Sequence, residues 1–523
     1  MTARIGALCL VALVLWSAGC ASVPKGPTPA EIAAARATAD ARLLEGCYDC
    51  LLFARDTYAR FATGKLRPEF LLPLFEAELL ITLREKELAM DFAASFARAQ
   101  TLAAELQPTI DAARYLAIVE ATPSDAVGLP ETEELAFRRA HQTFVPKING
   151  EIAWLATGAM RPAVREYLSL SIDCKYINRA REAGVPRRLS GVREVPAGTS
   201  PLLAYRLSTC DALNRLALDA VRQQVPSFVE ATLFVARLEM TMATRTGGAK
   251  ARPMLADAYA RFPQSPSVTY LNGNFQQLIG VCKDALPYYD ETLVLKPLHE
   301  NALLGRIVCL TFTNKLDEAI ASATHMISLK TSNMYEAYYW RAWIHHHRQD
   351  LPPARRDIED ARRLALTGNI HRLAGRIEYD QDDLDMAEKD FTAAKAGSDG
   401  ATDCVSRFYL GLVANQRSKS GDAAAHFEDA MVCYARAADY HEGSLRVMQA
   451  RTDIDPDFRE RQIEGLTAAL KEERTQQYAS ACNAANHHAR AGNLQKARTL
   501  LDVAAKDPSL EKVVAELRRI IGG

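Results

Sequence analysis

The sequence predicts an all-α protein built from repeated pairs of helices. Aromatic residues make up only 7% of the 523 residues, while Ala and Leu are abundant, and this composition favours helices over sheets. Apolar residues recur at helical spacing, and no alternation of apolar and polar residues is long enough for a sheet. One pattern of small and aromatic residues also returns about every 34 positions in the C-terminal half. We therefore expect a helical solenoid.

Composition sets limits on function. Hydrophobic residues amount to 48% and charged residues to 24%, which is ordinary for a folded soluble protein and argues against a disordered chain or a polytopic membrane protein. The 63 Lys and Arg nearly balance the 64 Asp and Glu, so the formal net charge is −1. Nucleic-acid binders use a basic field that this chain lacks, and no nucleic-acid partner is expected.

Residues 1–19 predict a signal peptide. Arg4 places a positive charge near the N-terminus, Ile5–Trp16 is an apolar run, and small residues precede Cys20. This run is shorter than the roughly 20 apolar residues that a membrane-spanning helix needs. The placement of Cys20 directly after Ala18 and Gly19 resembles a bacterial lipobox, with an ordinary secretory cleavage site as the alternative.

The lipobox resemblance implies that Cys20 is acylated and becomes the new N-terminus. The next residue is Ala21 and not the Asp that retains many lipoproteins in the inner membrane, so the resemblance implies an outer-membrane lipoprotein facing the periplasm. Residues 20–29, rich in Pro and small residues, would then form the lipidated tether. Several acyl chains hold firmly because each buried methylene contributes about 0.8 kcal/mol.

The repeat is clearest in residues 264–523. Its first copy places Gly273 in one helix, Ala285 and Tyr289 in the next, and Pro297 after it. The residues equivalent to Ala285 in the successive copies are Ala285, Ala319, Ala354, Ala387 and Ala423. A last copy spans Ala485–Ala504, and the gap before it predicts one irregular repeat over about residues 440–473.

This pattern resembles the tetratricopeptide repeat (TPR), a helix–turn–helix of about 34 residues. The resemblance implies that Gly273, Gly375 and Gly411 let paired helices approach closely. Tyr289, Phe391 and Phe427 would fill the space between repeats, and Gly280, Asn314, Asp382 and Gly492 would form turns. The TPR-like array is thus predicted over residues 264–523.

Residues 30–263 predict a less regular helical half with degenerate TPR-like pairs. The expected helical stretches are Glu31–Glu45, Asp49–Phe61, Pro73–Ala99, Ser227–Met242 and Ala251–Phe262. Ala121–Thr132 and Ala183–Pro201, dense in Gly, Pro and Ser, predict loops. Whether this half continues the solenoid is left open.

No catalytic or cofactor motif is present, so we predict no enzyme, no catalytic residue and no cofactor. Cys47 and Cys50 form a C-x-x-C that predicts a local disulfide or two packed thiols. The adjacent His345, His346 and His347 point about 100° apart on a helix, so no metal site is expected.

The remaining cysteines suit an oxidising compartment. Cys174 with Cys210 and Cys404 with Cys433 are the candidate disulfides, because the first pair flanks a loop and the second would join the ends of two antiparallel helices. Cys282 with Cys309 is a weaker pair that would leave Cys482 free. Alternatively, most of these side chains are small buried apolar groups.

The TPR resemblance implies that the first helix of each repeat lines a concave groove that binds a protein or peptide. Asn suits backbone amides, Arg suits carboxylates and aromatics suit apolar side chains. The implied partner-binding residues are Tyr270, Asn274, Tyr339, Trp343, His346, Asn369, Arg372, Arg376, Tyr379, Phe408 and Asn415, with Leu304, Val308 and Phe312 at equivalent positions of the second copy.

Two binding functions remain open, beside an enzyme with its active site in residues 28–263, which converging titratable residues would identify and which no residue spacing in that half supports. The first is a lipid-anchored periplasmic scaffold that holds a protein partner in an envelope complex. The alternative is an accessory that binds a small ligand for a periplasmic solute transport system, with an enclosed polar pocket as its discriminating feature.

Overall fold

The computed structural model is helical throughout the residues that it describes, and no β-strand occurs among them. The described residues are 27–107, 109–122, 148–182, 195–210, 215–241, 248–331, 333–397 and 403–522, with the backbone alone for 148–149, 173–182 and 210. The signal peptide and Cys20 lie outside this part of the chain, as does most of both predicted loops.

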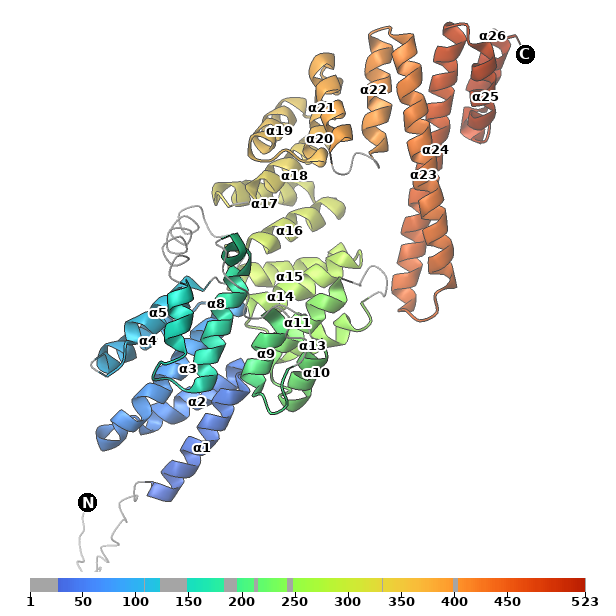
Figure 1. The fold of residues 1–523 in the computed structure, drawn as a ribbon. Coiled ribbons are helices and arrows are strands. Elements are labelled where there is room, and N and C mark those ends of the chain that lie inside the picture. The colour runs from blue at the N-terminus through green and yellow to red at the C-terminus, as the bar shows by residue number, and fades with distance from the viewer. Residues whose placement is uncertain are drawn as a thin grey trace, which may run out of the picture.

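The N-terminal half packs its helices around α3 (Figure 1). Helix α3 (Arg67–Glu87) is buried over almost its whole length. Helix α1 begins with a capping box between Thr28 and Glu31. The other N-terminal helices are α1 (Pro29–Glu45), α2 (Tyr48–Phe61), α4 (Ala93–Leu106), α5 (Ala112–Ala121), α7 (Ile148–Leu155), α8 (Pro162–Glu182), α9 (Pro201–Cys210), α10 (Arg215–Gln224), α11 (Val229–Met240) and α13 (Ala251–Arg261).

The stretch Pro73–Ala99 is divided between two helices, which differs from the sequence prediction of continuous helical periodicity. Helix α3 ends at Glu87 and α4 begins at Ala93. Between them Ala89 adopts a left-handed backbone conformation with φ of 58°. The apolar spacing continues across the break because both helices contribute to the same core.

The C-terminal half consists of consecutive antiparallel helix pairs, as the repeat predicts (Figure 1). The five alanines at the position of Ala285 are fully buried, and so is Ala497 in the last copy. The helices are α14 (Pro266–Leu278), α15 (Cys282–Leu295), α16 (Glu300–Phe312), α17 (Leu316–Ser328), α18 (Met334–His347), α19 (Leu351–Leu364), α20 (Gly368–Asp380), α21 (Leu384–Ala396), α22 (Cys404–Gln416), α23 (Ser420–Ala450), α24 (Pro456–Arg490), α25 (Leu494–Ala504) and α26 (Glu511–Ile520).

Close approach within the pairs explains the repeated glycines. A Cβ atom placed on Gly375 would lie 2.9 Å from the Phe391 ring, and one on Gly411 would lie 2.7 Å from the Phe427 ring. Real Cβ atoms do not approach other atoms so closely, so only glycine fits. The predicted roles of these glycines and aromatics are confirmed.

The predicted turn residues are confirmed as well. Gly280, Asn314, Asp382 and Gly492 all have positive φ, between 60° and 81°. Asn and Asp tolerate this left-handed region better than most residues. Each of the four ends the first helix of a pair and reverses the chain into the second.

The prediction of an irregular repeat at residues 440–473 is wrong. These residues instead extend α23 and α24 into one long helical hairpin that reverses at residues 451–455 (Figure 1). The segments on either side of the turn lack the Gly-rich or Pro-rich breaks that would divide them into a further pair. Pro456, at the first position of α24, marks the reversal.

The hairpin returns toward the N-terminal half. Helices α14–α22 stack away from that half, and the hairpin runs back beside them (Figure 1). At its tip Met448, Ile454 and Phe458 are buried and belong to the same apolar cluster as the core around α3. The tip is therefore anchored and not a free arm.

Candidate functional site

The first helices of the five C-terminal pairs form one continuous face. Helices α14, α16, α18, α20 and α22 each contact the next member of this series. We call the side chains that these helices expose the first-helix face. All eleven predicted partner-binding residues lie on these five helices, and their surroundings differ along the series.

A pocket of about 520 Å³ occupies the end of this face at α14 and α16. Val308 and Phe312 come from α16, and Phe312 is 70% exposed. The exposed Lys283 is the one charged residue in the lining. The lining residues are Gln277, Gly280, Val281, Cys282, Lys283, Val308, Phe312 and Thr313.

A row of aromatic rings continues from the pocket across α18. The Phe312 ring lies edge-on to Trp340, with 6.0 Å between ring centroids, and Trp340 lies 6.3 Å from Trp343. Trp343 in turn stacks on His347 at 5.1 Å. Trp340 and Trp343 are only partly buried. The α18 segment therefore presents aromatic surface that a partner could cover.

Two arginines follow on α20. Arg372 donates from Nε to the buried carboxylate of Asp403 at 3.0 Å, which fixes it between α20 and α22. Arg376 lies over the ring of Tyr409, 5.8 Å from its centroid. No described carboxylate pairs with Arg376, and its buried Nε has no hydrogen-bond partner among the described residues.

Tyr339 of α18 joins the aromatic row to the arginines. Burial raises the pKa of its hydroxyl, while the positive charges of Arg372 and Arg376 oppose that rise. The nearby Glu336 carboxyl also has its pKa raised by burial. The charges of Arg372 and Arg376 thus act on an aromatic side chain at the centre of the face.

Some predicted residues serve the fold more than the exposed face. Tyr270 packs between Tyr289 and His299, and burial raises its pKa. His346 is buried, and its Nε2 lies 2.7 Å from Asp380 of α20, so it joins two repeats.

Phe408 is partly buried against Phe427, with 5.4 Å between ring centroids. Tyr379 packs edge-on against Tyr409, and Asn274 is half-buried. Asn369 and Asn415 are exposed. Of the predicted set, Trp343 and Arg376 thus combine accessibility with chemistry suited to a ligand.

Sequence reasoning missed three contributors. Trp340 sits beside the predicted positions of α18, Tyr409 supports Arg376, and Lys283 belongs to the second helix of its pair. Repeat numbering alone does not find them, because each contributes through a neighbour in another helix. An exposed aromatic such as Phe312 at the end of a first helix was the available signal for the pocket.

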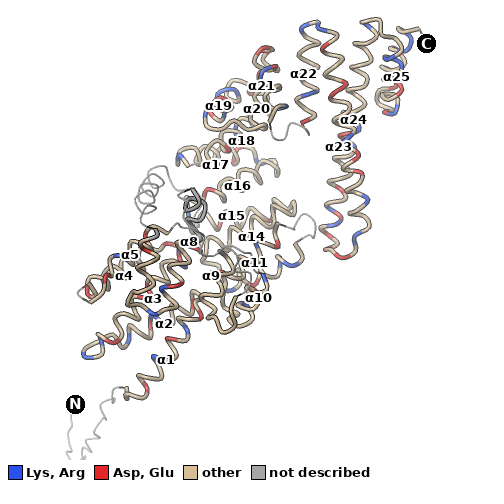
Figure 2. Tube along the Cα trace, in the orientation of Figure 1, with Lys and Arg blue, Asp and Glu red and all other residues tan. Residues whose placement is uncertain are grey.

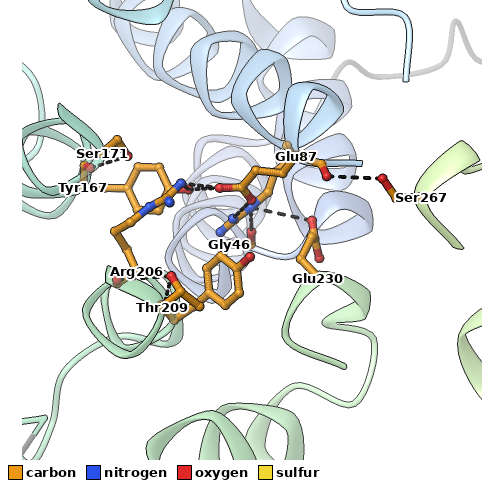
Figure 3. A network of polar contacts seen from close by, with 10 residues as sticks. Gly46, Glu87, Tyr167, Ser171, Arg206, Thr209, Glu230 and Ser267 are labelled. Atoms are coloured by element: carbon orange, nitrogen blue, oxygen red, sulfur yellow. Dashed lines mark hydrogen bonds and ion pairs between the residues drawn. The ribbon is translucent and has the colours of Figure 1, made fainter. Parts of the chain in front are cut away.

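A second polar cluster lies deep in the N-terminal half (Figure 3). Arg84 of α3 is 1% exposed and donates from Nε to the Gly46 carbonyl oxygen at 2.9 Å and from Nη1 to Glu87 at 2.5 Å. Arg206 of α9 bonds to Glu87 and also donates to the Tyr167 hydroxyl at 2.8 Å. Charged side chains of α3 and α9 thus meet beside the Tyr167 hydroxyl of α8.

Glu230 of α11 completes this cluster. Its Oε1 lies 3.6 Å from Arg84 Nε, and neither carboxylate oxygen has a hydrogen-bond partner among the described residues. Burial raises the pKa of Glu230 to about 7, although the positive charge of Arg84 opposes the rise. Rings of Tyr167, Tyr205 and Phe228 surround the Arg84 guanidinium. Arg84, Arg206 and Glu230 are buried and the Glu87 side chain is only 12% exposed, and we interpret the cluster as a structural node.

Disulfides join residues in both halves. Cys404 and Cys433 are bonded, as are Cys282 with Cys309 and Cys47 with Cys50. Cys482 is buried and free. The candidate pair Cys174 and Cys210 involves side chains outside the described part of the chain.

No family model matches the sequence, and no curated protein matches it. Among solved structures, YrrB, a TPR protein with an unusual peptide-binding site, is similar at 14% identity over 34% of this chain and 91% of its own, with a TM-score of 0.29. The Cut9–Hcn1 structure of the APC/C matches at 13% identity over 94% and 96%, with a TM-score of 0.37. Yeast Tom70 matches at 12% identity over 94% and 95%, with a TM-score of 0.30.

The fold is a TPR-like helical repeat. At these identities and scores, the helix pairs, buried alanines and glycine–aromatic contacts of the chain itself carry that assignment. Acidic and basic residues are interspersed along its helices (Figure 2). In the described residues, no helix has the length and apolarity needed to cross a membrane, and no three potential ligands gather for a metal ion.

Proposed function

We propose that this protein is a lipid-anchored scaffold of the bacterial envelope that binds a partner protein on its first-helix face. The observation that carries the proposal is the partly exposed aromatic row of α18 beside Arg376, an arginine without a carboxylate partner among the described residues. Aromatic and arginine side chains contribute most of the binding energy at many protein interfaces.

The proposed location is the periplasmic side of the outer membrane. The lipobox-like sequence around Cys20 supports an anchor, and the tether of residues 20–29 would connect it to α1. Three disulfides in the described part of the chain support an oxidising compartment, since thiols stay reduced in the cytosol.

An affinity capture tests the binding proposal. Residues 21–523 would be immobilised and exposed to detergent-solubilised envelope extract, beside a Trp343→Ala, Arg376→Gln double variant. Neither substitution removes a contact to the buried carboxylates, so the variant should keep its fold, which circular dichroism would check. We expect a specific protein to be retained by the native chain and lost by the variant.

The remaining outcomes separate the alternatives. Equal capture by both forms would move the binding surface away from the first-helix face. The absence of any captured protein would favour the small-ligand accessory of a solute transport system. Localisation has its own test, because Cys20→Ser should abolish labelling by radioactive palmitate and release the protein from membranes.

A further inference from the structure

The Cys47–Cys50 disulfide joins residues that the backbone already holds together. Cys47 is the N-cap of α2 and Cys50 lies three positions later, where the Leu51 N–H donates to the Cys47 carbonyl oxygen at 2.9 Å. The other two disulfides of the described residues span 27 and 29 positions, and each joins two helices. A short loop constrains the unfolded chain least, so a structural role accounts poorly for this bond.

The surroundings of Cys47 stabilise a thiolate. Its Sγ accepts a hydrogen bond from the Cys50 backbone N–H at 3.1 Å, and the Ser227 hydroxyl oxygen lies 3.3 Å from the same sulfur. A disulfide sulfur carries no proton, so this hydroxyl is the donor. Both hydrogen bonds strengthen when the sulfur is negatively charged, and the N-terminus of α2 favours the same charge. The site therefore favours the reduced form of Cys47.

The surroundings of Cys50 suit a protonated thiol instead. Glu45 Oε2 lies 3.2 Å from Cys50 Sγ. The disulfide sulfur has nothing to donate to this carboxylate, whereas a thiol does. The negative charge of Glu45 also disfavours a second thiolate at this position. Reduction would thus give a thiolate at Cys47 and a thiol at Cys50, each with a partner already in place.

Exposure separates the two sulfurs in the same sense. Cys47 is fully buried, whereas Cys50 is 3% exposed beside Glu45, whose side chain is 30% exposed. An incoming thiolate therefore reaches Cys50, and Cys47 is the better leaving group because its thiolate is stabilised. The Gly46 carbonyl oxygen, held by Arg84 at 2.9 Å, keeps the start of α2 in position while the bond opens (Figure 3).

We propose that Cys47–Cys50 is a redox-active disulfide that accepts two electrons from a dithiol. One thiolate of the dithiol attacks Cys50 Sγ, the Cys47–Cys50 bond breaks, and Cys47 leaves as a thiolate. The second thiolate of the dithiol then attacks its own sulfur in the mixed disulfide and releases Cys50. The dithiol becomes a disulfide, and of its two protons one goes to Cys50 and the other to water.

This site lies in the N-terminal half, away from the first-helix face. The inference therefore goes beyond the proposed function and does not depend on it.

A redox titration of the native sequence tests the proposal. Residues 21–523 would be equilibrated at pH 7 in mixtures of reduced and oxidised dithiothreitol, trapped with iodoacetamide and mapped by mass spectrometry. We expect Cys47–Cys50 to be half reduced at a ratio of reduced to oxidised dithiothreitol about tenfold or more below that needed for Cys282–Cys309 or Cys404–Cys433. Circular dichroism should show no loss of helix at that ratio.

A variant at Ser227 tests the stabilisation of the Cys47 thiolate. Ser227→Ala removes one of its hydrogen-bond donors and should raise the ratio for half reduction about fivefold. Ser328→Ala removes an exposed hydroxyl on α17 and is the matched control, which should leave the ratio unchanged.

Single-cysteine variants test which sulfur is attacked. In Cys47→Ser, the remaining Cys50 should form a stable mixed disulfide with 5-thio-2-nitrobenzoate. In Cys50→Ser, the fully buried Cys47 should react about tenfold more slowly. Adding Glu45→Gln to Cys47→Ser should accelerate labelling of Cys50, because loss of the carboxylate charge favours its thiolate. Peptide mapping assigns each product to its cysteine.

Two further reagents define the electron donor. Glutathione should reduce the bond poorly, because it has no second thiol and its negative charge is repelled by Glu45 and the exposed Asp49. Reduced thioredoxin carries the dithiol on a protein. Reduction by thioredoxin at the rate of dithiothreitol would identify a protein dithiol as the donor, and much slower reduction would identify a small dithiol.

Three results would overturn the inference. They are reduction of all three disulfides at the same ratio, reduction of Cys47–Cys50 only together with loss of helix, and faster labelling of Cys47 than of Cys50. An unchanged ratio in Ser227→Ala would refute the stabilised thiolate on which the exchange depends. None of these outcomes bears on the capture experiment with the first-helix face.

Discussion

Replacing Glu230 by Gln is expected to remove a pH-dependent cost of folding from the N-terminal half. The carboxyl group is 3% exposed and has no hydrogen-bond partner among the described residues. Burial raises its pKa from the ordinary 4.5 to about 7 in the folded protein. The folded state therefore holds the proton more tightly than the unfolded state does, and stability falls as pH rises from 4.5 toward 7.

The magnitude follows from the size of the shift. Each pKa unit corresponds to about 1.4 kcal/mol, so ionised Glu230 costs on the order of 3 kcal/mol above pH 7. This value already includes the attraction of Arg84, because that attraction lowers the same pKa. A neutral Gln resembles the protonated carboxyl. Glu230→Gln should therefore match the native protein near pH 4, below the ordinary pKa of 4.5, and exceed its stability near pH 8.

Urea unfolding of residues 21–523 at the two pH values measures this difference. Substituting Trp340 and Trp343 by Phe in both proteins leaves Trp154, which packs against the N-terminal core, as the fluorescent reporter. The other titrating groups are the same in the native protein and the variant, so their contributions to the pH dependence of stability cancel in the comparison. Glu464→Gln, an exposed carboxyl of the hairpin, provides the matched control.

Parallel pH dependences of the native protein and Glu230→Gln would refute the reasoning. That result would mean that the Glu230 charge is not desolvated as its burial indicates. A variant less stable at both pH values would instead show that the ionised group stabilises Arg84 by more than its own burial costs.

Three further perturbations test the C-terminal half. Phe391→Ala should lower its free energy of unfolding by about 3–5 kcal/mol, since the ring fills the space between repeats, and the tryptophans of α18 report the urea transition. An unchanged midpoint would contradict that packing. Serine at both Cys404 and Cys433 should cost about 2–4 kcal/mol, and reducing agent should then have less effect on the variant than on the native chain. Serine at both Met448 and Phe458 should free the hairpin tip and increase the radius of gyration in small-angle scattering with little loss of helix. A constant radius would show that the tip is held in another way.

The repeats could be predicted because their contacts are short-range. Gly375 meets Phe391 only 16 positions later, and Gly411 meets Phe427 at the same separation. Each helix pair contains both residues of its glycine–aromatic contact. The spacing of small and aromatic residues along the chain therefore indicates the helix pairs directly. The disulfide between Cys404 and Cys433, 29 positions apart, follows from the same local geometry.

The binding face was predictable only in part. Repeat numbering placed Trp343 and Arg376 on first helices, but it also nominated His346, which the structure buries against Asp380 of the next repeat. Which side chain stays accessible depends on the contact between neighbouring repeats. The pocket depends on a turn and two helices, and no single segment encodes it.

The sequence by itself determined the helical class, the period of the C-terminal repeats, their turn residues and the absence of known catalytic motifs, because these depend on local propensity and on contacts within one or two repeats. Tertiary structure decided the long hairpin and the buried cluster around α3. Arg206 and Glu87 lie 119 positions apart, and the hairpin tip joins a core formed hundreds of residues earlier. Contacts between residues so far apart produce no repeating pattern in the sequence, because each depends on how complete helices pack against one another.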